Sequence, residues 1–175
     1  MEGTPPKTGK FSLNYGALLG LVGIVFGFML YSADMHYEQG WEINAINLVI
    51  MAGIIIFGIA QFRKANAGYL TLGQAMKVGL GIALVGFVIG IIYQMIFINV
   101  IEPEFMDNMM EIRKAEMIAQ NPNMTQEQVD NATEMMKKFS GPGMMIAFGA
   151  LASIFFGAIF SLIGGLILKK AQPTY

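Results

Sequence analysis

Methionine is the residue type in this sequence with the most distinctive side-chain chemistry. Seven of the fifteen Met residues fall between positions 102 and 140, several of them three or four residues apart. A thioether is a flexible apolar group that adapts to varied protein surfaces, and it also ligates Cu(I). Three interpretations stay open: these side chains pack the segment onto itself or against lipid, bind a protein partner, or bind Cu(I). The candidate partner-binding residues are Met106, Met109, Met110, Met117, Met135 and Met136.

The other residue types that carry chemistry are scarce. The chain has no Cys and a single His, His36, which excludes disulfides, thiolate sites and multi-histidine sites within one chain. No Ser-His-Asp set, zinc motif, phosphate loop or nucleotide fingerprint occurs. The net charge is -1 and there is no basic arm. We therefore expect no enzyme activity, no cofactor and no nucleic-acid partner and, apart from the open Cu(I) interpretation of the Met residues, no metal site.

Four long apolar stretches without charged residues dominate the chain, at 11–33, 43–62, 78–101 and 144–168. A bilayer core needs roughly 20 residues of helix to cross it, and in lipid only helices or closed barrels satisfy every backbone polar group. The sequence predicts an all-α, polytopic membrane protein whose four transmembrane helices contact the lipid bilayer. We expect a single membrane domain over 1–175, with tails at 1–10 and 169–175, transmembrane helices at 11–33, 43–62, 73–101 and 143–168, and a loop at 102–140.

The loop at 102–140 is too patterned to be coil. Asn121-Pro122 ends a first apolar-sided helix, and a second begins with Thr125 as N-cap and Gln128 three residues later, which is the spacing of a capping box. The sequence therefore predicts a helical hairpin between the third and fourth transmembrane helices.

Most basic residues lie on one predicted side of the membrane. Seven Lys and Arg residues lie in the two tails or around the connection between helices two and three, whereas the other two connections are acidic. By the positive-inside rule both termini are cytoplasmic and the hairpin is extracytoplasmic. In the basic connection, Thr71 is the expected N-cap of the third helix. Gln74 and Lys77 follow it closely and could bind an anionic lipid or a partner's carboxylate, or only anchor the helix.

Small residues recur at helical spacing in three of the four transmembrane helices, which lets helix backbones approach closely in lipid. Two interpretations compete: these stripes pack the four helices together, or one stripe stays free and docks on another chain. A repeat of two parallel hairpins is a third idea, because residues 20–23 and 83–86 resemble each other. The candidate packing residues are Gly16, Gly20, Gly23 and Gly27 in the first helix; Gly79, Ala83, Gly86 and Gly90 in the third; and Gly149, Ser153, Gly157, Ser161 and Gly165 in the fourth.

Several motifs resemble a known family. They are GYLTLGQAMKVG at 68–79 after FRK at 62–64, the segments 93–97 and 101–105, QNPNMTQEQ at 120–128, and KKFS at 137–140 before Pro142. Together they resemble the bacterial four-helix membrane proteins known as domain-of-unknown-function family 4199. The resemblance implies a multi-pass protein of a bacterial inner (cytoplasmic) membrane, and it brings no activity, ligand or catalytic residue.

Two functions remain open. The first is a non-enzymatic accessory or scaffold subunit with a protein partner or a homo-oligomeric state. The alternative is a small transporter or channel acting as an oligomer, which predicts a polar path lined by Asn47, Gln94 and the serines of the fourth helix.

Overall fold

The computed structural model describes residues 6–38 and 40–170, and their regular structure is helical. Four helices are long and apolar enough to cross a membrane: α1 (Thr8–Ser32), α2 (Trp41–Ala65), α3 (Leu72–Ile96) with the π-helical turn η1 (Phe97–Ile101) that continues it, and α6 (Pro142–Leu168). Two shorter helices, α4 (Phe105–Gln120) and α5 (Gln126–Phe139), lie between α3 and α6 in the chain. The four long helices begin and end within three residues of the spans predicted from the sequence.

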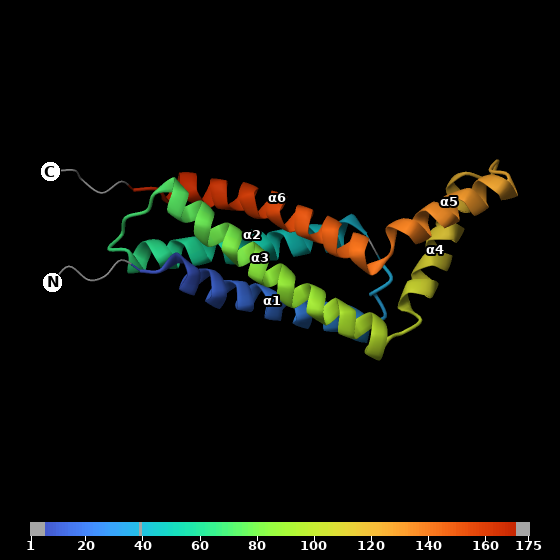
Figure 1. Cartoon of the computed structure of the whole chain (residues 1–175), viewed down its shortest axis with the longest axis horizontal. Coiled ribbons are helices and arrows are strands. Elements are labelled where there is room, and N and C mark those ends of the chain that lie inside the picture. The colour runs from blue at the N-terminus through green and yellow to red at the C-terminus, as the bar shows by residue number, and fades with distance from the viewer. Residues whose placement is uncertain (1–5, 39, 171–175) are drawn as a thin grey trace. The chain divides into compact units, whose positions relative to one another are not determined.

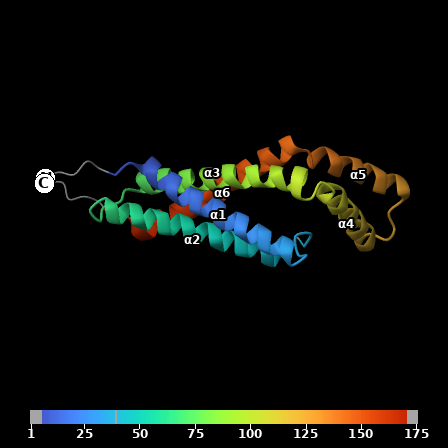
Figure 2. The same cartoon turned by 90° about the horizontal axis from the view of Figure 1, so that it is seen from below.

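The described residues gather into two compact units, one formed by residues up to 90 together with those from 150 onward, and one formed by 91–149. Within the first unit α1, α2, α3 and α6 run side by side and alternate in direction (Figures 1 and 2). One end of this unit therefore holds the start of α1, the α2–α3 connection and the end of α6. We call it the basic end, because it carries all seven bases of the first unit.

The tightly packed half of the first unit is the half nearest the basic end. Its core consists of Ile55, Ile59, Phe62, Leu70, Ala75, Val78, Ile82 and Ala83, each at most 1% exposed. The other buried residues that the structure describes in this unit also lie in this half, apart from Gly20 and Gly86 near the middle of their helices. The outward faces of the four helices remain apolar and exposed, as at Val49, Phe57 and Ile167, and such faces suit contact with lipid tails.

The α2–α3 connection closes the basic end. Leu70 exchanges two backbone hydrogen bonds with Lys170, at 2.9 and 3.0 Å, in an isolated antiparallel bridge. Thr71 caps α3: its backbone N–H donates to Gln74 Oε1 at 2.9 Å, and its hydroxyl accepts from the Gln74 N–H at 3.2 Å. The predicted cap is confirmed, and the Gln74 amide is engaged in it, so a capping box begins this helix.

The second unit contains the end of α3, η1, α4, α5 and the start of α6. Helices α4 and α5 form a hairpin whose second helix begins with the predicted capping box: the Thr125 hydroxyl accepts from the Gln128 N–H, and the Gln128 side chain accepts from the Thr125 N–H. Val129, 4% exposed, is the buried residue of α5. Pro142 is the first residue of α6, where its fixed φ suits a helix and its missing N–H costs nothing.

Candidate functional site

The predicted small-residue stripes lie at helix–helix contacts in the tightly packed half. An added Cβ on Gly16 would lie 2.5 Å from the Val85 Cβ, and one on Gly20 would lie 2.6 Å from the Ile89 Cβ. These separations are well inside ordinary carbon contact of about 3.5–4.0 Å. Glycine is therefore the residue that lets α1 and α3 approach this closely.

The stripes of α3 and α6 meet in the same way. A Cβ on Gly157 would lie 2.6 Å from the Ala83 Cβ, and a Cβ on Gly79 would overlap the Ser161 side chain. Gly165 lies against Ala75, with an added Cβ 2.9 Å away. Further along α3, an added Cβ on Gly86 would lie 2.7 Å from Leu19 Cδ2 of α1. Helix α3 thus contacts both α1 and α6 through its small residues.

Four stripe members lie elsewhere. Gly23 and Gly90 have no atom within 4 Å of an added Cβ. Both line a cavity of about 240 Å³ in the loosely packed half of the first unit, which also contacts Gly20, Gly86, Met51 and Asn47. Gly27 and Gly149 are half-buried. The stripes therefore combine close helix contacts in one half with an open cavity in the other.

The polar side chains of the predicted path are mostly engaged with the backbone. The Ser153 hydroxyl, which lines the cavity, donates to the Ala83 carbonyl at 3.0 Å. Ser161 is fully buried and its hydroxyl donates to the Gly157 carbonyl. The Asn47 amide donates to the Ile43 carbonyl at 3.1 Å. The cavity walls are otherwise apolar, so its polar groups are few and locally satisfied.

Ser12 is a packing residue that the predicted stripe of α1 did not include. It is 8% exposed, and its hydroxyl lies 3.2 Å from the Val78 carbonyl of α3. Gly81 faces it, because an added Cβ there would overlap the Ser12 side chain. The signal was present: Ser12, Gly16 and Gly20 follow one another at intervals of four, so Ser12 extends the α1 stripe by one turn.

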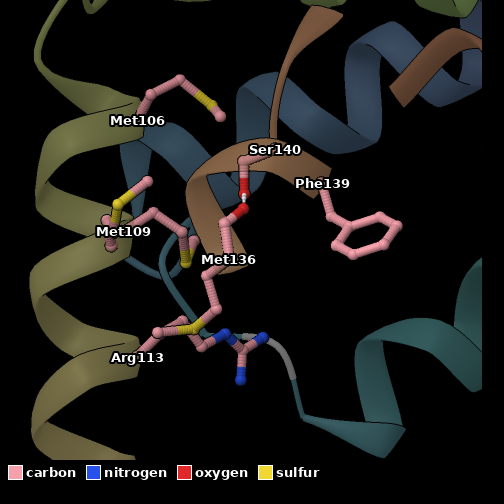
Figure 3. A pocket seen from close by; sticks show the side chains of 7 residues that line it. Met106, Met109, Arg113, Met136, Phe139 and Ser140 are labelled. Atoms are coloured by element: carbon pink, nitrogen blue, oxygen red, sulfur yellow. Dashed lines mark hydrogen bonds between the residues drawn. The ribbon is translucent and has the colours of Figure 1, made fainter. Parts of the chain in front are cut away.

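A second candidate site lies on the hairpin. A pocket of about 250 Å³ is lined by Met106, Met109, Met110, Arg113, Met136, Phe139 and Ser140. Figure 3 shows Met106 extending from α4 and Met136 from α5 into the space between the two helices. The Ser140 hydroxyl donates to the Met136 carbonyl at 2.8 Å and fixes the last turn of α5. Four of the six predicted Met residues are thus brought together.

The remaining two Met residues lie outside this pocket. Met117 is half-buried further along α4, and Met135 is 62% exposed. Arg113, at the pocket wall, forms an ion pair with Glu116 at 3.1 Å. In the described part of the chain no group of three or more His, Cys, Asp or Glu side chains is arranged to hold a metal ion.

Comparison with known proteins identifies the family. A family model described as protein of unknown function, DUF4199, matches residues 14–170. The chain belongs to the DUF4199 family. The resemblance drawn from the sequence motifs is confirmed, and the match covers nearly the whole chain. No curated protein and no solved structure matches this DUF4199 protein.

Proposed function

We propose that this DUF4199 protein is a non-enzymatic accessory or scaffold subunit of a bacterial inner membrane that binds a protein partner through its Met-lined pocket. Both termini and the basic end face the cytoplasm in this proposal, and the hairpin is extracytoplasmic. The distribution of bases supports this orientation, since Lys and Arg accumulate in short cytoplasmic connections.

The observation that carries the proposal is the pocket between α4 and α5. Its volume of about 250 Å³ lies below the roughly 300–1,000 Å³ typical of small-molecule sites. Such a volume suits one or two apolar side chains of a partner, and a few anchor side chains in pockets dominate the affinity of many protein interfaces. Phe139, 52% exposed at the pocket wall, adds apolar contact area.

The same pocket is less suited to Cu(I). Its lining residues include thioethers but no Cys or His, and Cys thiolates are the other soft ligands that select Cu(I). Protein contact therefore fits the side chains of the pocket better than metal binding does.

Two neighbouring methionines provide a matched test. Met136 lines the pocket, whereas Met135 is exposed outside it. A C-terminally tagged protein, extracted gently from its own membranes, should retain a near-stoichiometric partner. Met136→Ala should weaken partner binding by about 30-fold or more and lower the amount of partner recovered, because truncating an anchor residue costs roughly 2 kcal/mol or more. Met135→Ala should leave it unchanged. Equal recovery with both variants would refute the pocket as the binding site.

The cavity in the first unit favours a second candidate function, a small transporter or channel. Gly23→Leu places a side chain into the cavity at a position where an added Cβ meets no neighbour. If the cavity is a path, the wild-type protein in liposomes should pass protons, potassium or chloride, and Gly23→Leu should block that flux. Absence of flux for all three ions in the wild type would count against this function.

A further inference from the structure

The basic end of the first unit is an unusually uniform charged surface. It carries Lys7, Lys10, Arg63, Lys64, Lys77, Lys169 and Lys170. The acids of the described chain lie elsewhere, at 34–42 on the opposite connection of the first unit and at 102–134 in the second unit. Because no described carboxylate lies at the basic end, its positive charge is not neutralised within the described residues.

Two of these bases are held in place by the α2–α3 connection. The Arg63 Nε donates to the Gly68 carbonyl at 3.0 Å, and this bond does not use the four N–H groups of the two Nη atoms. Gly68 adopts a positive φ of 84°, which places its carbonyl where few other residues could. Arg63 itself is half-buried. A guanidinium fixed in this way loses little freedom when it forms a bidentate contact with a phosphate.

Lys170 is fixed on the same connection. Its backbone pairs with Leu70, and its Nζ lies 5.8 Å from the centre of the Tyr69 ring. Tyr69 is held in turn, because its carbonyl accepts from the Asn66 amide at 2.9 Å. The connection at 66–70 therefore brings a base from the end of α2 and a base that follows α6 to one short loop.

We propose that the basic end binds the phosphate of an anionic phospholipid, with Arg63 and Lys170 as the principal contacts. The loop directly follows an apolar helix of 25 residues and precedes another, so it lies where lipid headgroups lie if these helices span the bilayer. Basic pockets between transmembrane helices are a recurrent way to hold anionic headgroups. Such binding requires only that the four helices span a membrane, so it does not depend on the proposed protein partner.

The test compares two double variants of the full-length protein purified in detergent. Arg63→Gln/Lys170→Gln removes the two principal bases, and Lys137→Gln/Lys138→Gln removes two bases of α5. Native mass spectrometry with added phosphatidylglycerol gives the lipid affinity of each, with phosphatidylcholine as the zwitterionic reference lipid. Wild type should prefer phosphatidylglycerol. At about 1 kcal/mol per base near an anionic surface, the first variant should bind it up to about 30-fold more weakly, whereas the control should match wild type.

A single variant and a competition with inorganic phosphate complete the test. If Arg63→Gln prevents folding, Lys170→Gln alone retains the backbone bridge and should weaken binding about fivefold by the same reasoning. Inorganic phosphate at 10 mM should not displace the lipid. Displacement would contradict the proposal and show that the site binds soluble phosphate instead of a lipid headgroup. Equal affinity for the two lipids, or an equal loss in the α5 control, would overturn the proposed site.

Discussion

The contact between α1 and α3 gives the sharpest prediction, because two glycines on one face of α1 have opposite surroundings. A Cβ at Gly20 would lie 2.6 Å from both the Cβ and the Cγ2 of Ile89, about 1 Å short of ordinary contact. The Ile89 Cβ cannot rotate away, so the two helices must separate. Overpacking of this kind costs about 1–3 kcal/mol, and we expect Gly20→Ala to lower the free energy of unfolding by that amount less the gain of up to about 1 kcal/mol that Ala brings to a helix.

Gly23→Ala is the matched control. It adds the same methyl group three residues further along α1, where no atom lies within 4 Å of the new carbon. Replacing Gly by Ala within a helix contributes up to about 1 kcal/mol, so Gly23→Ala should leave stability equal or slightly raised. Because this gain applies equally to both variants, they should differ by the overpacking cost of about 1–3 kcal/mol.

Unfolding in mixtures of mild detergent and SDS measures this difference. Near-ultraviolet circular dichroism reports the tertiary packing of the aromatic pairs of this half, such as Phe11 with Phe62, whose ring centres lie 5.3 Å apart. A second substitution, Ile89→Gly, removes the obstructing atoms, so it should cost less in the Gly20→Ala background than in wild type. Equal unfolding midpoints for Gly20→Ala and Gly23→Ala would refute the close approach of these helices.

Three further predictions concern the caps, the bridge and the orientation. Thr125→Ala removes the capping box of α5 and should cost about 0.5–2 kcal/mol, seen as faster hydrogen exchange in the first turn of α5 and not in α3. Lys170→Pro removes the N–H that donates to Leu70 at 3.0 Å and should lower stability by about 1 kcal/mol in the SDS titration, whereas Lys170→Ala should not. Single cysteines, introduced into a chain without native Cys, should react in intact cells with an impermeant maleimide at positions 36 and 123 and not at 66 or 172, of which 172 lies outside the described residues. Labelling only at 66 and 172 would reverse the orientation.

The sequence was sufficient for the elements whose signals are local. Length and apolarity defined the four long helices, and the spacing of Thr125 and Gln128 predicted a capping box that the structure contains. The same spacing joins Thr71 to Gln74, yet only the Thr71 cap was predicted. The Gln74 side chain was instead predicted to bind a lipid or a partner's carboxylate, or to anchor the helix. Its place near the expected headgroups indicated those roles more directly than it indicated a helix cap.

Contacts between helices were harder to predict, because a stripe of small residues does not say which helix it faces. Gly58 and Gly164 lie outside the predicted stripes, yet an added Cβ would lie 2.5 Å from Ile82 Cδ1 at Gly58 and 3.3 Å from Ile56 Cγ1 at Gly164. Gly23 and Gly90 lie within the stripes and face a cavity instead. The pairing of Leu70 with Lys170 joins residues 100 positions apart in the chain, and no local pattern signals it.

That pairing has a consequence for biogenesis. Lys170 follows the fourth helix, so the bridge can form only after the ribosome has delivered all four helices to the membrane. Until then the Leu70 N–H and carbonyl lack the partners that they have in the finished protein. In a chain truncated before Lys170 the loop at 66–71 therefore lacks the two backbone hydrogen bonds that hold it to the end of α6. The bridge thus makes the final conformation of this loop depend on a residue synthesised about a hundred residues later.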